Sequence, residues 1–315
     1  MSVDYKSLRI VFLGTPEFAV AALDNLVQAG CIIAAVITSP DKLGGRGMGL
    51  QQSAVKQYAV QKGLHLLQPE KLKATDFLED LRALKADLQV VVAFRMLPEL
   101  VWNMPPLGTI NVHGSLLPQY RGAAPINWAV INGESETGVT TFKLQHQIDT
   151  GDILLQQKLV IGEAETAGEL HDRMKVAGAD LLLATIKILA EGNLKEVPQS
   201  ACKTATMNPQ KHAPKIFPET CKVDWSKSSA EVYNLIRGLS PYPAAFTELN
   251  GKKLKIFAAA KEAGQPLTAG NIDTDQKTYL RFACCDGWIN IKELQLEAKK
   301  RMRVTAFLAG YRFPE

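Results

Sequence analysis

Two polar side chains on one expected strand have the types and the spacing that acyl transfer requires. Asn111 and His113 are two positions apart in the run 109–113, so on a strand both side chains project from the same face. An amide can donate a hydrogen bond to the oxyanion of a tetrahedral intermediate. An imidazole can take up and release a proton near neutral pH. The pair is therefore a candidate site for the transfer of an acyl group.

A histidine that moves protons is usually oriented by a third group. Asp149 and Asp152 follow a later strand, on the turn 148–152, and either carboxylate can supply that group. A turn of this composition also forms without any catalytic purpose, and a lone histidine at a strand end is more often structural. From the residues alone this is a candidate site, and the choice between the two aspartates stays open.

The apolar runs around the candidate site predict an α/β fold with a parallel sheet. We expect strands at 8–13, 31–38, 88–94 and 109–113 and helices at 17–29 and 76–85. This alternation is typical of a Rossmann-like sheet covered on both faces, in which ligands bind beyond the carboxyl ends of the strands. The first turn, 14–18, lacks the G-x-G-x-x-G dinucleotide pattern, so the fold alone does not indicate a nucleotide cofactor.

The chain is expected to form two domains, since its 315 residues exceed the usual size of one. A strand at 153–161 and a long helix at 167–190 complete a Rossmann-like catalytic domain, residues 1–192. The segment 193–212 is aperiodic and carries Pro, Asn and Lys, which predicts a linker. Residues 213–315 contain a helix and then short strands separated by turns, which predicts a small OB-like β-barrel.

Composition indicates a globular enzyme, with 46% hydrophobic and 22% charged residues. No apolar run approaches the roughly 20 residues of a membrane span, and the N-terminus reads as a first strand, so we expect a cytoplasmic protein without membrane contact. The five cysteines have no metal-site spacing, which predicts no metal. Cys284 and Cys285 are adjacent in a strand-like run and are expected to face opposite sides.

The charge of the chain is unevenly distributed. From Lys203 onward 18 Lys and Arg face 11 Asp and Glu, a balance of +7, and the remainder carries −3 of the overall +4. A basic C-terminal third beside a slightly acidic body indicates an anionic partner large enough to contact both.

A longer motif runs through the candidate site. The stretch 111–125 reads N-V-H-G-S-L-L-P-Q-Y-R-G-A-A-P, and T-G-V-T at 137–140 and D-T-G at 149–151 follow it. This pattern resembles the 10-formyltetrahydrofolate-dependent formyltransferases. The resemblance extends over almost the whole chain, with further matching segments at 14–18, 39–47, 223–226 and 237–244.

The resemblance implies formyl transfer and a role for each member of the candidate site. Asn111 polarises the formyl group, His113 moves protons, and Asp149 holds His113. The implied formyl donor is 10-formyltetrahydrofolate, and the positions that match its binding residues are Ser115, Leu116, Leu117, Pro118, Phe94, Arg95, Met96, Leu97, Gln145 and Ile148.

The motif is closest to the branch of the family that formylates the methionine carried by initiator tRNA. We therefore expect charged initiator tRNA and folate as partners, with no obligate protein partner, and a tRNA-binding role for residues 213–315. The expected tRNA contacts are Lys42, Arg46, Lys252, Lys253, Lys255, Lys300, Arg301 and Arg303. The chain departs from familiar relatives at Met48 and Gly49, which replace loop lysines, and at Arg95, where a small residue is usual.

Two other functions share parts of this pattern. A folate-dependent enzyme that formylates an amino sugar nucleotide would carry the same H-G-S-L-L-P stretch, but it needs neither the basic C-terminal third nor the Gly-Arg-Gly loop. A tRNA-binding module without catalysis would not need the set Asn111, His113 and Asp149.

Overall fold

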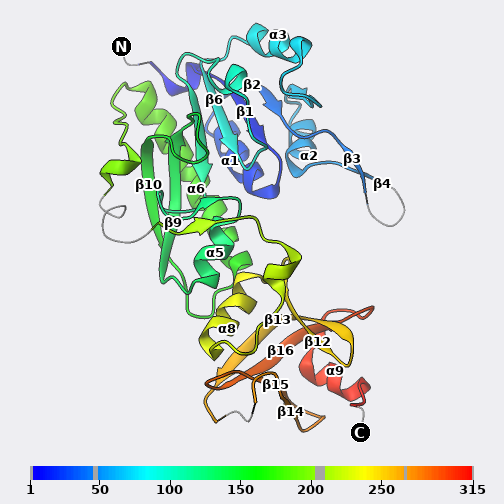
Figure 1. Ribbon diagram of the computed structural model, residues 1–315. Coiled ribbons are helices and arrows are strands. Elements are labelled where there is room, and N and C mark those ends of the chain that lie inside the picture. Colours follow the sequence, from blue (N-terminus) through cyan, green and yellow to red (C-terminus); the bar gives the residue numbers. More distant parts are fainter. Residues whose placement is uncertain (1–2, 45–48, 203–209, 266–267, 314–315) are drawn as a thin grey trace. The chain divides into compact units, whose positions relative to one another are not determined.

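The structure is a computed structural model that describes residues 3–44, 49–202, 210–265 and 268–313 (Figure 1). By its internal contacts the chain divides into two compact units. The first comprises residues 1–122, 138–159 and 171–211, and the second comprises 123–137, 160–170 and 212–315. Two short stretches, 123–137 and 160–170, therefore group with the C-terminal part of the chain and not with the strands that flank them.

Within the described residues, a seven-stranded sheet forms the centre of the first unit. Its strands are β1 (Arg9–Gly14), β2 (Ile32–Ile37), β5 (Leu66–Leu67), β6 (Leu88–Val92), β7 (Thr109–His113), β9 (Glu136–Lys143) and β10 (Ile153–Val160), in the order β10-β9-β7-β6-β1-β2-β5. The strands from β7 to β5 run parallel, which confirms the predicted Rossmann-like sheet. β9 runs antiparallel to β7, a direction that the apolar pattern of a buried strand does not encode.

Helices cover both faces of this sheet (Figure 1). They are α1 (Glu17–Gln28), α2 (Ala54–Gln61), α3 (Thr75–Ala83), α4 (Glu99–Trp102) and α6 (Ala167–Ala190). Val11 and Leu13 of β1 pack in one cluster with residues of α3 and α4. On the other face α1 and α6 lie side by side, joined by a hydrogen bond of 2.8 Å from Asn25 Nδ2 to Asp180 Oδ1.

Shorter elements connect these strands and helices, and the last two of them lie in the second unit. They are η1 (Tyr5–Ser7), β3 (Lys42–Gly44), β4 (Gly49–Gln51), β8 (Arg121–Gly122), η2 (Gln199–Ala201), β11 (His212–Ala213) and η3 (Pro218–Cys221). The predicted helices at 17–29, 76–85 and 167–190 correspond to α1, α3 and α6. In the described part of the chain, no helix is long and apolar enough to cross a membrane.

The second unit contains a curled antiparallel sheet. Its elements are α5 (Pro125–Ile131), α8 (Ser229–Gly238), β12 (Ala245–Leu249), β13 (Lys252–Glu262), β14 (Ile272–Thr274), β15 (Leu280–Ala283), β16 (Trp288–Leu296), β17 (Met302–Arg303) and α9 (Val304–Gly310). The strands follow the order β12-β13-β16-β15-β14, with β17 added to β16. The pairing of β13 with β16 shifts register between Ile256 and Ala259, and such a bulge bends a strand.

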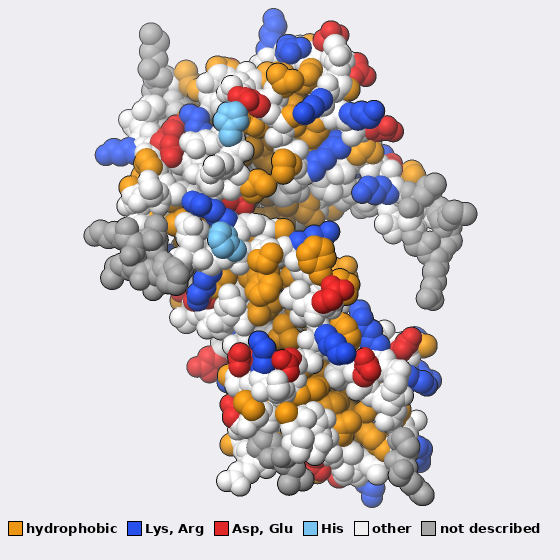
Figure 2. Space-filling view, in the orientation of Figure 1, with side chains coloured by type: hydrophobic (Ala, Val, Ile, Leu, Met, Phe, Trp, Pro, Cys, Tyr) orange, Lys and Arg blue, Asp and Glu red, His pale blue; other side chains and the backbone are white. Residues whose placement is uncertain are grey.

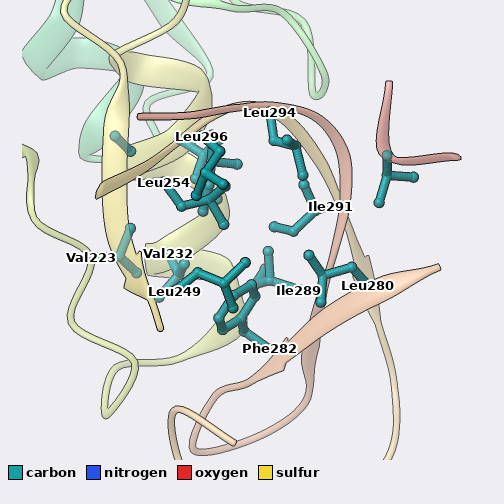
Figure 3. Close-up of a cluster of buried hydrophobic side chains, with 14 of the residues drawn as sticks. Val223, Val232, Leu249, Leu254, Leu280, Phe282, Ile289, Ile291, Leu294 and Leu296 are labelled. Carbon is teal, nitrogen blue, oxygen red and sulfur yellow. The ribbon is translucent and has the colours of Figure 1, made fainter. Parts of the chain in front are cut away.

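The curled sheet encloses its own apolar core (Figure 3). Leu254 and Ile256 of β13, Phe282 of β15 and Ile289 and Ile291 of β16 are at most 1% exposed. Full burial of such side chains stabilises a fold by about 1.5–3 kcal/mol each. Figure 3 shows labelled side chains of this core, among them Leu254, Phe282 and Ile291, converging from opposite strands, which is the arrangement of a barrel-like domain.

Candidate functional site

The two residues that could do chemistry lie at the carboxyl end of β7. Asn111 is paired with Val91 of β6 on one side and with Phe142 of β9 on the other. Val112 lies against α6, where its Cγ1 atom would be 3.2 Å from a Cβ at Gly178. Asn111 and His113 therefore point to the opposite face, and the prediction that they share a face is confirmed. The Asn111 side chain is half-buried and makes no hydrogen bond to another described residue.

The imidazole of His113 is 7% exposed and is held from two sides. Its Nε2 atom lies 2.9 Å from the backbone carbonyl of Tyr120, which accepts a hydrogen bond from it. Its Nδ1 atom faces Asp149, at 3.9 Å from Oδ2, a separation too long for a direct hydrogen bond. The ring also meets Phe142 edge to face, with 6.4 Å between centroids. Nδ1 is therefore the nitrogen available to take up a proton, beside a carboxylate that can stabilise the resulting imidazolium.

The carbonyl of Tyr120 is a part of the site that sequence reasoning missed. Tyr120 has a φ of +59°, a left-handed conformation that non-glycine residues seldom adopt. The backbone of the following segment contributes as well, since the N–H of Gly122 donates a hydrogen bond of 2.9 Å to Asp149 Oδ2. Backbone groups carry no signature in a sequence, so nothing in the residue types pointed to them.

Of the two candidate aspartates, Asp149 is the one whose carboxylate lies beside His113. Its own φ is +54°, and its side chain is 11% exposed. A Cβ at Gly151 would lie only 1.7 Å from the carbonyl oxygen of Lys143. Only glycine therefore fits at this position of the turn. Asp152 instead accepts a hydrogen bond of 3.0 Å from the Lys143 N–H with its backbone carbonyl.

The predicted folate-binding stretch 115–118 is a loop, and its polar side chain, Ser115, forms a hydrogen bond to the backbone just beyond it. Ser115 Oγ donates to the carbonyl of Gln119 at 2.6 Å. Thr140 Oγ1 donates to the Ser115 carbonyl at 2.6 Å and accepts from the Leu117 N–H at 3.2 Å. Leu117 is 1% exposed and packs with Phe142. Ser115, Leu117 and Pro118 are buried and Leu116 is half-buried.

In the second predicted folate segment, 94–97, residues 95–97 line a cavity of about 440 Å³, together with residues 72–73 and 98–100. Met96 is 74% exposed. The Arg95 guanidinium turns away from solvent, donating to the carbonyls of Pro69 and Glu70, and burial lowers its pKa. Phe94 and Leu97 pack in the cluster around α3.

The two predicted folate segments approach the same edge of the sheet. Leu144 packs both against the cluster that contains Leu97 and against the cluster that contains Leu117. Gln145 and Ile148, the remaining predicted folate residues, are exposed, Ile148 by 62%.

The predicted tRNA contacts fall into two groups. Lys42 is exposed on β3, whereas Arg46 lies outside the described residues. In the second unit Lys252 and Lys253 are exposed at the start of β13, and Lys253 Nζ lies 3.7 Å from the centroid of the Phe246 ring. Lys255 Nζ donates to the Pro243 carbonyl at 3.3 Å.

Among the predicted tRNA contacts nearer the C-terminus, one arginine forms an ion pair with a carboxylate. Arg301 Nη2 lies 2.5 Å from Glu293 Oε2, and Arg301 and Arg303 both lower the pKa of Glu293, Arg301 by the larger effect. Lys300 and Arg303 are exposed. In the lower part of Figure 2, Lys and Arg side chains are interspersed with Asp and Glu and do not form one uninterrupted basic patch.

No group of three or more His, Cys, Asp or Glu side chains able to hold a metal ion occurs among the residues that the structure describes. Cys284 is fully buried and Cys285 is exposed, which confirms that the two adjacent cysteines face opposite sides.

Two family models match the chain. The model for formyl transferase matches residues 8–186, which include the whole candidate site, and the model for the formyl transferase C-terminal domain matches residues 215–312. The chain belongs to the formyl transferase family. The resemblance predicted from the motif around Asn111 is thereby confirmed.

Curated relatives in this family match the chain from end to end. A protein of Parabacteroides distasonis named methionyl-tRNA formyltransferase is 54% identical over 98% of this chain and 97% of its own length. A protein of the same name from Flavobacterium johnsoniae is 48% identical over 98% of both chains.

Solved structures share the fold of this formyl transferase at lower identity. WlaRD, a sugar 3N-formyl transferase crystallised with dTDP and 5-N-formyl-THF, is 19% identical, with a TM-score of 0.66 over 93% of this chain and 99% of that chain. HypX from Aquifex aeolicus, in complex with tetrahydrofolic acid, is 18% identical, with a TM-score of 0.64 over 96% of this chain and 47% of that chain.

Proposed function

We propose that this formyl transferase is a methionyl-tRNA formyltransferase. It transfers the formyl group of 10-formyltetrahydrofolate to the free amino group of methionine on initiator tRNA. The observation that carries this proposal is the identity of 54% to a relative of that name over 98% of the chain. The relative covers both units, so the likeness includes the basic C-terminal third as well as the site.

The site supplies the groups that formyl transfer to an amine needs. Asn111 Nδ2 donates to the formyl oxygen as negative charge develops on it, and a single donor of this kind contributes roughly 10²–10³-fold to rate. His113 Nδ1 takes the proton that the attacking amine loses and returns one to the departing nitrogen. Asp149, at 3.9 Å, stabilises the imidazolium that exists between these two steps.

The formyl donor is held, in this proposal, along the loops 94–97, 115–118 and 145–148. The cavity of about 440 Å³ that is lined in part by the first of these loops has the size of a small-molecule site; Asn111, His113 and Asp149 are not among its lining residues. Because the Ser115 hydroxyl bonds to the Gln119 carbonyl and the Leu117 side chain packs against Phe142 and Ile153, the donor is recognised in that loop chiefly by backbone groups.

Charged initiator tRNA contacts Lys42 and Arg46 of the first unit and the basic residues of the second. We propose an OB-like barrel for residues 213–315, a linker at 193–212 and a catalytic domain at 1–192. The family models, which end at 186 and resume at 215, support these boundaries. A cytoplasmic location, without membrane or obligate protein partners, fits an enzyme with these two substrates.

The direct test is formylation by the purified protein, with 10-formyltetrahydrofolate as donor and with methionyl-initiator tRNA or an amino sugar nucleotide as acceptor. We expect rapid transfer to the tRNA and none to the sugar. Transfer to the sugar alone would establish the alternative enzyme and overturn the proposal.

Two variants of the pair on β7 test the catalytic assignment. Asn111→Ala and His113→Ala should each lower kcat by at least about 10²-fold and change the affinity for charged tRNA little, because neither side chain belongs to the basic surfaces. Full activity of His113→Ala would show that the enzyme does not use this site. Binding of charged tRNA by the wild-type protein without any formylation would instead establish a tRNA-binding module without catalysis.

A further inference from the structure

One buried glutamine beyond the long helix α6 reaches back to the candidate site. Gln199 begins the short helix η2, inside the segment that sequence reasoning assigned to a linker. Its side chain is nevertheless 4% exposed. A buried amide is costly unless both of its polar atoms are hydrogen-bonded, so its partners define what it does.

Both ends of the Gln199 amide are saturated. Its Oε1 atom accepts from Nε of Arg121 at 3.0 Å and from Nη2 of the same guanidinium at 2.5 Å. Its Nε2 atom donates to the carbonyl of Asp149 at 2.8 Å and to the carbonyl of Gly151 at 2.8 Å. The side chain therefore spans two segments that are far apart in sequence, 120–122 and 149–151.

These are the two segments that hold the His113 ring. From the first, the Tyr120 carbonyl accepts from Nε2 at 2.9 Å. From the second, the Asp149 carboxylate faces Nδ1 at 3.9 Å. The Gly122 N–H closes the arrangement by donating to the same carboxylate at 2.9 Å. The Gln199 side chain and the Gly122–Asp149 bond thus join the two segments that flank the histidine.

Glutamine suits this position because one segment presents hydrogen-bond donors and the other presents acceptors. The first offers guanidinium donors and requires an acceptor, while the second offers two carbonyl oxygens and requires a donor. An amide provides both at one site. A carboxylate would satisfy Arg121 and repel the carbonyls, and an apolar side chain would leave all of them without a partner.

We propose that Gln199 is a positioning residue for formyl transfer, which ties the 120–122 and 149–151 segments together and so fixes His113 between Tyr120 and Asp149. It does not touch the reacting atoms. Its contribution is to the orientation of the imidazole and of the carboxylate beside it. The inference rests on the proposed function for its kinetic test and on the geometry alone for its structural test.

Two substitutions test the hydrogen bonds that Gln199 makes to the two segments. Gln199→Glu keeps the acceptor for Arg121 and places negative charge against the carbonyls of Asp149 and Gly151. Gln199→Met has a similar length and bonds to neither side. Gln89→Met is a matched control, because Gln89 is 1% exposed and its Oε1 accepts from Thr109. Thermal unfolding of all three shows whether each variant is folded.

The kinetic test is the formylation of methionyl-tRNA by these variants. A displacement of about 1 Å at a catalytic group can cost about 10²-fold, so we expect Gln199→Glu and Gln199→Met to lower kcat by about 10–100-fold. KM for both substrates should stay within about threefold of wild type. Gln89→Met should retain wild-type kcat.

A double-mutant cycle shows whether Gln199 acts through Asp149. If it does, Gln199→Glu should add less than about threefold to the loss already caused by Asp149→Asn, since residues that act as a unit are not additive. Multiplied losses, a loss in KM alone, or an unchanged kcat would each overturn the inference. A wild-type protein that formylates no methionyl-tRNA would refute the proposed function instead.

Hydrogen exchange tests the geometry without any substrate. The Gly122 amide is protected by its bond to Asp149, so peptides that cover 120–122 and 149–151 should exchange faster in Gln199→Met than in wild type. The Gln89→Met control should leave both peptides unchanged. Equal exchange in wild type and Gln199→Met would show that the two segments do not depend on the glutamine, and would overturn the inference even in an inactive protein.

Discussion

Replacing Asp149 with Asn tests how the site handles charge. The substitution removes the negative charge that faces His113 Nδ1 at 3.9 Å. It keeps an oxygen that can accept the hydrogen bond from the Gly122 N–H, so the turn should hold its shape. The variant therefore isolates the electrostatic role of the carboxylate from its structural role.

The size of the effect follows from the distance. Two unit charges 3.9 Å apart interact by about 4 kcal/mol at an effective dielectric constant of about 20, which suits a pair as buried as this one. At about 1.4 kcal/mol per factor of ten, this sets an upper bound of about 10³-fold on the loss of rate. An Asn dipole recovers part of the interaction, so we expect kcat to fall by about 10²–10³-fold.

The assay is single-turnover formylation of methionyl-tRNA at saturating 10-formyltetrahydrofolate, which reports the chemical step directly. Asp152→Asn is the matched control, because Asp152 contributes its backbone carbonyl to the turn and should leave the rate near that of wild type. In a His113→Ala background Asp149→Asn should cost almost nothing further. A rate for Asp149→Asn within threefold of wild type, or an equal loss in Asp152→Asn, would refute the assignment.

Three further outcomes follow from the contacts of other residues. Changing both Lys253 and Lys255 to Gln should raise KM for tRNA at unchanged kcat. It should also lower the slope of log KM against log salt concentration by about one per lysine. An unchanged slope would show that these residues do not contact the tRNA. Arg95→Ala removes the charged donor that bonds the carbonyls at 69–70 and holds the loop 94–97 in place. At about 1.5–3 kcal/mol per hydrogen bond to a charged group, KM for the folate should rise by at least roughly tenfold while KM for tRNA stays constant; the opposite pattern would contradict the placement. A thiol reagent at pH 8 should label Cys285 and spare Cys284. Burial raises the pKa of the Cys284 thiol to about 12, and only the thiolate reacts. Cys285→Ser should abolish the rapid labelling.

The sequence predicted well whatever depends on local periodicity. The spacing of two between Asn111 and His113 placed both on one face of β7, and the long amphipathic helix predicted at 167–190 coincides with α6. The predicted strand at 88–94 ends at Val92 because Ala93 adopts a φ of +47°, a conformation incompatible with an extended strand. The hydrophobic pattern gave no sign of that left-handed residue.

The parts of the site that the sequence did not reveal depend on backbone groups and distant segments. Tyr120 contributes its backbone carbonyl, and Gly122 its backbone N–H. Gln199 is 50 residues from Asp149 along the chain, in a segment whose composition is that of a linker. Residue types identify side-chain chemistry, whereas the direction of a carbonyl is decided by dihedral angles that several residues would permit.

The burial of His113 links the geometry of the site to its protection from water. Water competes with the amine for any activated formyl group, and an imidazole open to solvent could assist hydrolysis as readily as transfer. Here the ring is 7% exposed and the Asp149 side chain 11%. Burying these groups costs free energy, which the bonds from the Gly122 N–H and to the Tyr120 carbonyl offset. The same loops that orient the histidine therefore also limit the access of water to it.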